Sequence, residues 1–161
     1  MHLLGGMLAP WSSYYGNHQI ASVSIRFLHL VALILAGGTG LFADRQVLRT
    51  AKEGAEEREA VMVILGRCHK HVVSWIVVLG VTGALMAAAD TATYMVSKVF
   101  WIKMSLIGLL LANGVFLLAV ERRTRRLGVA VGWPRLMIVS TISAILWLTT
   151  LFMGTLLTVA A

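Results

Sequence analysis

The chain has 161 residues, of which 58% are hydrophobic and only 13% are charged, and its formal net charge is +7. Because a soluble domain averages about 25% charged residues, this chain has too few charges to cover a water-facing surface, which excludes a soluble protein. The basic balance indicates the cytoplasmic face of a membrane and not a nucleic-acid partner.

Four apolar stretches are free of formal charge and approach the length of about 20 residues that a bilayer-spanning helix needs. We predict helices over residues 22–44, 70–90, 97–120 and 136–158, after an extracytoplasmic N-terminal segment at residues 1–20. Antiparallel helices joined by short connections make residues 21–161 an all-α, integral membrane, four-helix up-down bundle. Residues 55–65 (AEEREAVMVIL) are a possible cytoplasmic extension of the second helix.

The cations predict the orientation of the bundle. Six of the fourteen Lys and Arg residues lie in the connection at residues 44–71, and five lie in the connection at residues 121–135. Because Lys and Arg concentrate on the cytoplasmic side, we expect both connections to be cytoplasmic and both termini to lie outside the cytoplasmic (inner) membrane. This assigns Glu121 to the inner side and Asp90 to the outer side, so no carboxylate pair is expected within the membrane.

Two polar residues fall inside the outer half of the predicted bundle. His29 and Lys103 each lie about two turns, roughly 10–12 Å, from the outer end of their helices. His29 shares a helical stripe with Ala36 and Gly40, so it is expected to face the interior at the depth of Lys103. Arg26 precedes His29 on the same stripe. Ionisable groups in a membrane indicate function; alternatively, Lys103 only reaches the headgroups and His29 only bonds a backbone carbonyl.

The stretch LGRCHKHVVSW, residues 65–75, contains a second polar group. His69 and His71 point about 200° apart on a helix, so at most one of them faces the interior, and His69 shares its stripe with small residues. A tetrahedral metal site needs three or four converging ligands. We therefore expect an interfacial basic cap here, and the alternative is that His69 or His71 is a metal ligand. A haem shared between His29 and this pair is disfavoured because the depths differ.

The cysteine content excludes one mode of haem binding. Cys68 is the only cysteine in the sequence. An internal disulfide and the paired cysteines of covalent c-type haem attachment are therefore both excluded. A haem in this chain would have to be the non-covalent b type.

Three stretches resemble the copper-resistance-protein-D-like superfamily, which includes HemJ-type protoporphyrinogen oxidases and several uncharacterised four-helix families. They are FLHLVALILAGGTGLFADRQVLR, SWIVVLGVTGALM and VFWIKMSLIGLLLANG. The likeness covers about residues 24–120 and fits the uncharacterised branches best. The resemblance implies that His29 and Lys103 are functional: the corresponding regions are associated with haem in the HemJ-type proteins and with copper handling in the copper group.

Three functions are compatible with these patterns. The first is a haem b-binding redox or electron-transfer module, with His29 as axial ligand and Lys103 or Arg26 near the propionates. The second is copper handling or transport, with His29 and methionine thioethers as soft ligands. The third is a non-catalytic subunit of a larger membrane complex or homo-oligomer, docked through its small-residue faces. The sequence assigns no catalytic residue, and the lipid bilayer is the expected surrounding in all three.

Overall fold

The computed structural model describes residues 2–160, with side chains for residues 8–157, and this part of the chain is almost entirely helical. The elements are α1 (His2–Asn17), α2 (Gln19–Arg49), the 3-10 turn η1 (Thr50–Lys52), α3 (Ala55–Ala89), α4 (Thr91–Val96), α5 (Lys98–Leu127) and α6 (Val129–Ala160). Four of the described helices, α2, α3, α5 and α6, are long and apolar enough to cross a membrane. This confirms the predicted all-α, four-helix up-down bundle.

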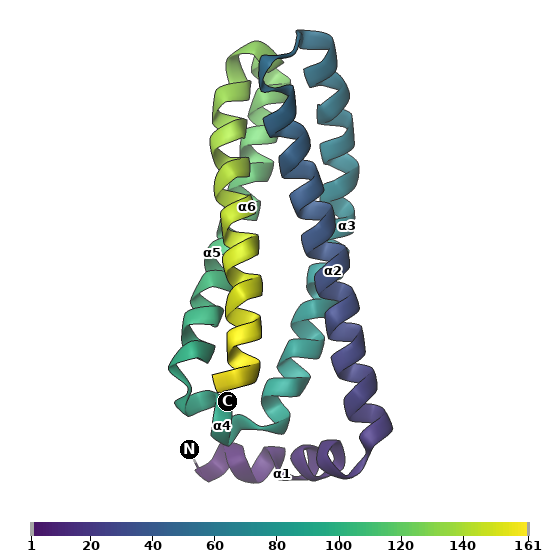
Figure 1. Cartoon of the computed structure of the whole chain (residues 1–161), viewed down its shortest axis with the longest axis vertical. Helices are drawn as coiled ribbons and strands as arrows, with labels where there is room; N and C mark the ends of the chain where they lie inside the picture. The colour runs from purple at the N-terminus through teal and green to yellow at the C-terminus, as the bar shows by residue number, and fades with distance from the viewer. Residues whose placement is uncertain (1, 161) are drawn as a thin grey trace.

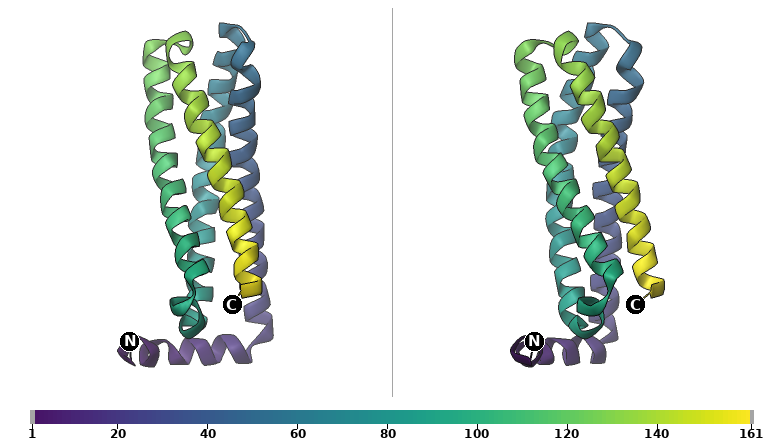
Figure 2. Two further views of the ribbon diagram at one scale, coloured as in Figure 1. Left: turned by 60° about the vertical axis from the view of Figure 1, so that its left-hand side comes forward. Right: turned by 90° about the vertical axis from the view of Figure 1, so that its left-hand side faces the viewer.

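The four long helices run side by side along the long axis, and α1 lies across one end of them (Figures 1 and 2). Both ends of the chain lie at this end of the bundle, which we call the α1 end. The turns that join α2 to α3 and α5 to α6 lie at the opposite end, which we call the turn end. Helix α2 packs on α3 and α6, and α5 packs on α6, whereas α3 and α5 are barely in contact. The bundle is therefore least closed between α3 and α5.

The helices extend further than the charge-free stretches predicted. Helix α3 begins at Ala55, so the suggested extension over residues 55–65 is part of it, and α5 continues to Leu127. The two predicted connections shrink to residues 50–54 and Gly128. Glu, Lys and Arg are good helix formers, so a formal charge marks the end of an apolar span and not the end of a helix. The 35 residues of α3 measure roughly 52 Å at 1.5 Å per residue, well beyond the bilayer core of about 30 Å.

The connection between α5 and α6 depends on glycine. Gly128 has a φ of 91°, a conformation that residues with a Cβ rarely adopt. One turn later, a Cβ on Gly132 would lie 2.7 Å from the backbone Cα of Thr124. Glycine at these two positions therefore allows the end of α5 and the start of α6 to pack in direct contact.

Two tryptophans organise the core. Near the turn end, Trp133 is 1% exposed and packs among Val47, Leu65 and Leu136. Further along α6, Trp147 packs against α2, where a Cβ on Gly40 would lie 2.8 Å from its Nε1 atom. The small residues of α2 therefore make room for an indole ring.

Helix α1 is attached to the bundle by hydrogen bonds to the end of α3. Trp11 Nε1 donates to the carbonyl oxygen of Leu85 at 2.9 Å, and Ser12 Oγ donates to that of Ala89 at 2.7 Å. The carbonyl of Ala89, in the last turn of α3, has no partner within its own helix. Helix α1 thus closes this end of α3.

Candidate functional site

His29 lies on α2 and faces α3. Its Nδ1 atom is 2.9 Å from Oγ1 of Thr82. The ring also covers Gly83, because a Cβ on that residue would lie 3.1 Å from Cε1 of His29. His29 is therefore oriented by its contact with Thr82, by the nearby backbone of Leu79 and by packing on a residue without a side chain.

The hydrogen bonds of Thr82 define the tautomer of His29. Oγ1 of Thr82 lies 2.8 Å from the carbonyl oxygen of Val78 and 3.2 Å from that of Leu79. A hydroxyl has a single hydrogen, and when it is donated to these carbonyls the oxygen accepts from Nδ1–H of His29. The lone pair of Nε2 is then free. Metal-ligating histidines are usually held in this way, with the second ring nitrogen bonded to a neighbouring group.

Lys103 lies on α5 and is half-buried against α6. A Cβ on Gly154 would lie 3.6 Å from its Nζ atom. In the part of the chain whose side chains are described, no hydrogen-bond or ion-pair partner of this ammonium group is found. The ammonium group is near enough to His29 to interact with it electrostatically. The two residues that the sequence singled out therefore lie in the same half of the bundle, towards the α1 end, on α2 and α5.

Arg26 lies on α2 towards the α1 end and is exposed. Its Nε atom donates to the hydroxyl oxygen of Tyr15, at 3.2 Å. This bond joins α2 to α1. The guanidinium carbon also lies 5.9 Å from the centroid of the Tyr15 ring.

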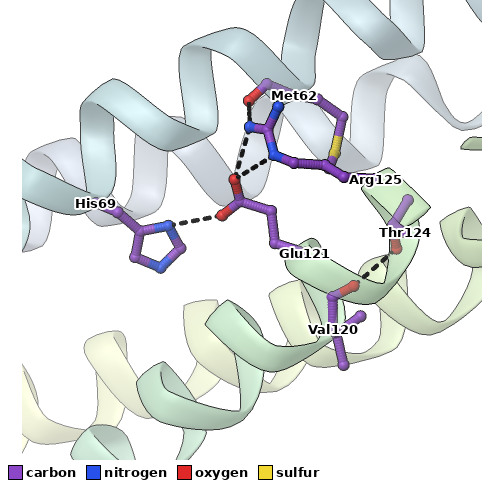
Figure 3. Close-up of polar contacts among 6 residues, drawn as sticks. All are labelled: Met62, His69, Val120, Glu121, Thr124 and Arg125. Atoms are coloured by element: carbon purple, nitrogen blue, oxygen red, sulfur yellow. Dashed lines mark hydrogen bonds and ion pairs between the residues drawn. The ribbon is translucent and has the colours of Figure 1, made fainter.

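His69 and His71 are separated by the structure. His69 faces the interior, and its Nδ1 atom lies 3.1 Å from Oε2 of Glu121 on α5. Oε1 of Glu121 accepts from Nε of Arg125 at 3.2 Å and from a terminal nitrogen at 2.7 Å. The same terminal nitrogen donates to the carbonyl oxygen of Met62 on α3 (Figure 3). His71 is exposed.

The assignment of Glu121 to a cytoplasmic connection is wrong. Glu121 lies within α5 and its side chain is only 7% exposed. A buried carboxylate normally needs hydrogen-bond or charge partners, and His69 and Arg125 provide them. The sequence did not predict the cluster of His69, Glu121 and Arg125, because it joins residues of two different helices, α3 and α5.

Asp44, the last residue of the predicted helix over residues 22–44, is a buried carboxylate. It is 1% exposed, and the hydroxyls of Ser140 and Ser143 on α6 lie beside it. With His69 and Ser143 it lines a cavity of about 200 Å³ between the four long helices. Asp44 and Glu121 thus place two carboxylates inside the bundle, where none was expected. A signal was present, because Asp44 continues the interior stripe of Ala36 and Gly40 at four-residue spacing.

The candidate metal ligands do not converge. Among the described residues, no group of three or more His, Cys, Asp or Glu side chains is arranged to hold a metal ion. His29 packs at Thr82, and Thr82 lies 13 positions beyond His69 on α3, which is roughly 20 Å at 1.5 Å per residue. His29 and His69 therefore belong to two separate polar sites.

Comparison with known protein families gives a match over most of the chain. Residues 11–159 match a family described as a family of unknown function, DUF6644. No curated protein and no solved structure matches the chain. Since the match covers nearly the whole sequence, the chain belongs to the DUF6644 family.

Proposed function

We propose that this protein is a haem b-binding module of a membrane redox or electron-transfer system, with His29 as the axial ligand. The observation that carries the proposal is the bond between Nδ1 of His29 and Oγ1 of Thr82. It fixes the ring and leaves the Nε2 lone pair free for a metal. The site lies between α2 and α3, two of the four helices long and apolar enough to cross a membrane.

The donor set fits haem better than a bare copper ion. A porphyrin supplies four of the iron ligands, so one protein imidazole is sufficient, as in globins and peroxidases. A copper ion needs several protein donors of its own. Among the described His, Cys, Asp and Glu residues, none joins His29 in a group of three. One oriented histidine is sufficient for a cofactor that brings its own ligands, whereas a copper ion at His29 would need methionine thioethers to complete its ligand set.

The positive charges near His29 support the same proposal. Lys103 has no described partner, and an ammonium group without a counter-ion is costly to bury. A haem carries two propionates, and Lys103 and Arg26 are the residues that would pair with them. Bound at His29, a haem would supply reversible one-electron chemistry, while the chain supplies the ligand, the positive charge and the apolar surroundings that tune it.

The test is the absorbance spectrum of the full-length protein purified from the membrane and titrated with haem. We expect a Soret band in the wild type and in His71→Ala, which removes an exposed histidine. We expect no Soret band in His29→Ala. Lys103→Met should weaken haem binding without abolishing it, because the lysine contributes charge and not the bond to iron.

Two outcomes would contradict the proposal. The first is a wild-type protein that shows no Soret band after haem titration, and the second is a His29→Ala variant that retains one. Stoichiometric copper held by the wild type and lost from His29→Ala would instead support copper handling. A chain that binds neither haem nor copper and co-purifies with other membrane proteins would support a structural subunit.

A further inference from the structure

We propose that Asp44 and His69 form a proton-binding site at the inner end of a proton path that begins at the turn end of the bundle. The site is separate from His29 and does not depend on haem. It rests on a connected set of polar groups, from exposed Arg125 to buried Asp44, and on one cavity at each end of this set.

The polar groups form a series from the surface inwards. At the turn end, exposed Glu59 and Arg125 line a cavity of about 320 Å³. Arg125 bonds Glu121, and Glu121 bonds His69 (Figure 3). His69 in turn lines the inner cavity of about 200 Å³ together with Asp44. Acidic and histidine side chains in such a series are the usual components of proton relays within membranes.

The charges of the cluster leave one proton to be shared. Arg125 is permanently charged and is neutralised by Glu121. The other pair, Asp44 and His69, is neutral overall when it holds one proton, whether that proton is on the carboxyl or on the imidazole. Because a net charge is costly to bury, the cluster favours one proton, and it can move between the two groups without changing the net charge.

The other groups around Asp44 leave this balance unchanged. Helix α6 presents the uncharged hydroxyls of Ser140 and Ser143 to the carboxyl. Helix α3 adds the thiol of Cys68 to the cavity wall. Arg45, the next residue of α2, is exposed.

One carboxyl oxygen of Asp44 has no hydrogen bond of regular geometry. Oδ2 of Asp44 and Oγ of Ser140 are buried and make no hydrogen bond of regular geometry with the described residues, although the Ser140 and Ser143 hydroxyls lie close enough to interact with the carboxyl. In a structural carboxylate the buried oxygens are bonded. An unbonded carboxyl oxygen beside a cavity is better suited to taking up and releasing a proton.

The path ends at Asp44. Towards the α1 end, Trp147 packs against Gly37 and Gly40 of α2, within an apolar cluster that includes Ala36 and Leu110. The side chains that pack there, among them Leu33, Val72 and Ile76, are apolar. A proton from the turn end therefore reaches Asp44 but is not passed on through this layer.

The test is infrared spectroscopy of the full-length protein in liposomes. We expect a protonated-carboxyl band that grows as the pH falls, shifts in D₂O and is missing from Asp44→Asn. His69→Gln keeps a hydrogen-bonding side chain but cannot carry the proton, and it should slow the D₂O shift at least tenfold. The double variant Glu121→Gln/Arg125→Gln removes both charges together and should slow it similarly. Glu56→Gln, which alters an exposed carboxylate of α3, should leave the rate unchanged.

Three results would overturn the proposal. A band that persists in Asp44→Asn, or that is absent from the wild type at every pH, removes the proton site. Unchanged exchange in both path variants removes the path. Loss of the band when NaCl replaces KCl at constant pH would show that Asp44, Ser140 and Ser143 hold a sodium ion in place of a proton.

Discussion

His29 and Thr82 are 53 residues apart in the sequence, yet a 2.9 Å contact between Nδ1 and Oγ1 joins α2 to α3. The hydroxyl also lies 2.8 Å from the carbonyl oxygen of Val78 one turn earlier. A backbone carbonyl therefore orients the threonine, and the threonine orients the histidine. This chain of contacts determines which ring nitrogen of His29 is available.

Thr82→Val should reduce haem affinity while leaving the fold intact. It keeps the side-chain shape and removes the hydroxyl, so the His29 ring loses its anchor. Loss of a group that orients a metal ligand typically costs about 10- to 100-fold in affinity. Haem titration followed by absorbance measures this change. Thr82→Ser keeps the hydroxyl and should bind like the wild type; equal affinities for all three proteins would show that the contact does not orient the ligand.

Gly83→Ala should displace the His29 ring. The new Cβ would lie 3.1 Å from Cε1 of His29, closer than normal van der Waals contact. Gly80→Ala is the matched control, because it lies one turn earlier on α3 and its Cβ would meet nothing within 4 Å. Both substitutions raise helix propensity by about 1 kcal/mol. Haem affinity should fall only in Gly83→Ala, and an equal affinity in the two variants would argue against the packing of the ring on Gly83.

Gly132→Ala should destabilise the bundle itself. Its Cβ would lie 2.7 Å from Cα of Thr124, and backbone atoms cannot move aside as a flexible side chain can. Overpacking of this kind costs about 1–3 kcal/mol, more than the gain in helix propensity. Thermal unfolding in detergent, followed by circular dichroism, should show a lower midpoint. Gly108→Ala has open space and should unfold at the wild-type temperature or above it.

The four long helices were predictable because each contains an uninterrupted apolar stretch near the length of a bilayer. Their ends were not, because Glu, Lys and Arg continue a helix as readily as they end an apolar run. His29 was expected to face the interior because it shares a stripe with small residues of its own helix. This prediction uses only the spacing of residues along a single helix, and the sequence contains that information.

The site around Asp44 could not be predicted in the same way. Its partners, His69 on α3 and Ser140 on α6, belong to helices that are distant in the sequence. Glu121 was assigned to a connection because it adjoins a run of arginines. Its buried partner, His69, is on another helix and could not be recognised from the sequence. In the sequence, a carboxylate next to cations is predicted to be solvent-exposed. Only the packing of the helices shows that one of these cations, Arg125, pairs with the buried carboxylate of Glu121.

The orientation of the bundle is the last prediction, and the structure makes its test specific. Both turns lie at one end and both termini at the other (Figure 1). The cations gather near the turns, at Arg45, Arg49 and Lys52 before α3 and at Arg122–Arg126 before Gly128. Since Lys and Arg favour the cytoplasmic side, the turn end should be cytoplasmic and the α1 end outside.

Alkaline phosphatase, which is active only outside the cytoplasm, distinguishes the two orientations. A fusion to the C-terminus should be active, and a fusion joined after Gly128 should be inactive although it is present at a similar level by immunoblot. A fluorescent protein that matures in the cytoplasm should give the reverse pattern at the same two positions. The opposite result would invert the bundle: the path to Asp44 would then begin outside, and His29 would lie in the cytoplasmic half. The direction from which protons reach His69 therefore depends on this measurement, whereas the geometry of the cluster does not.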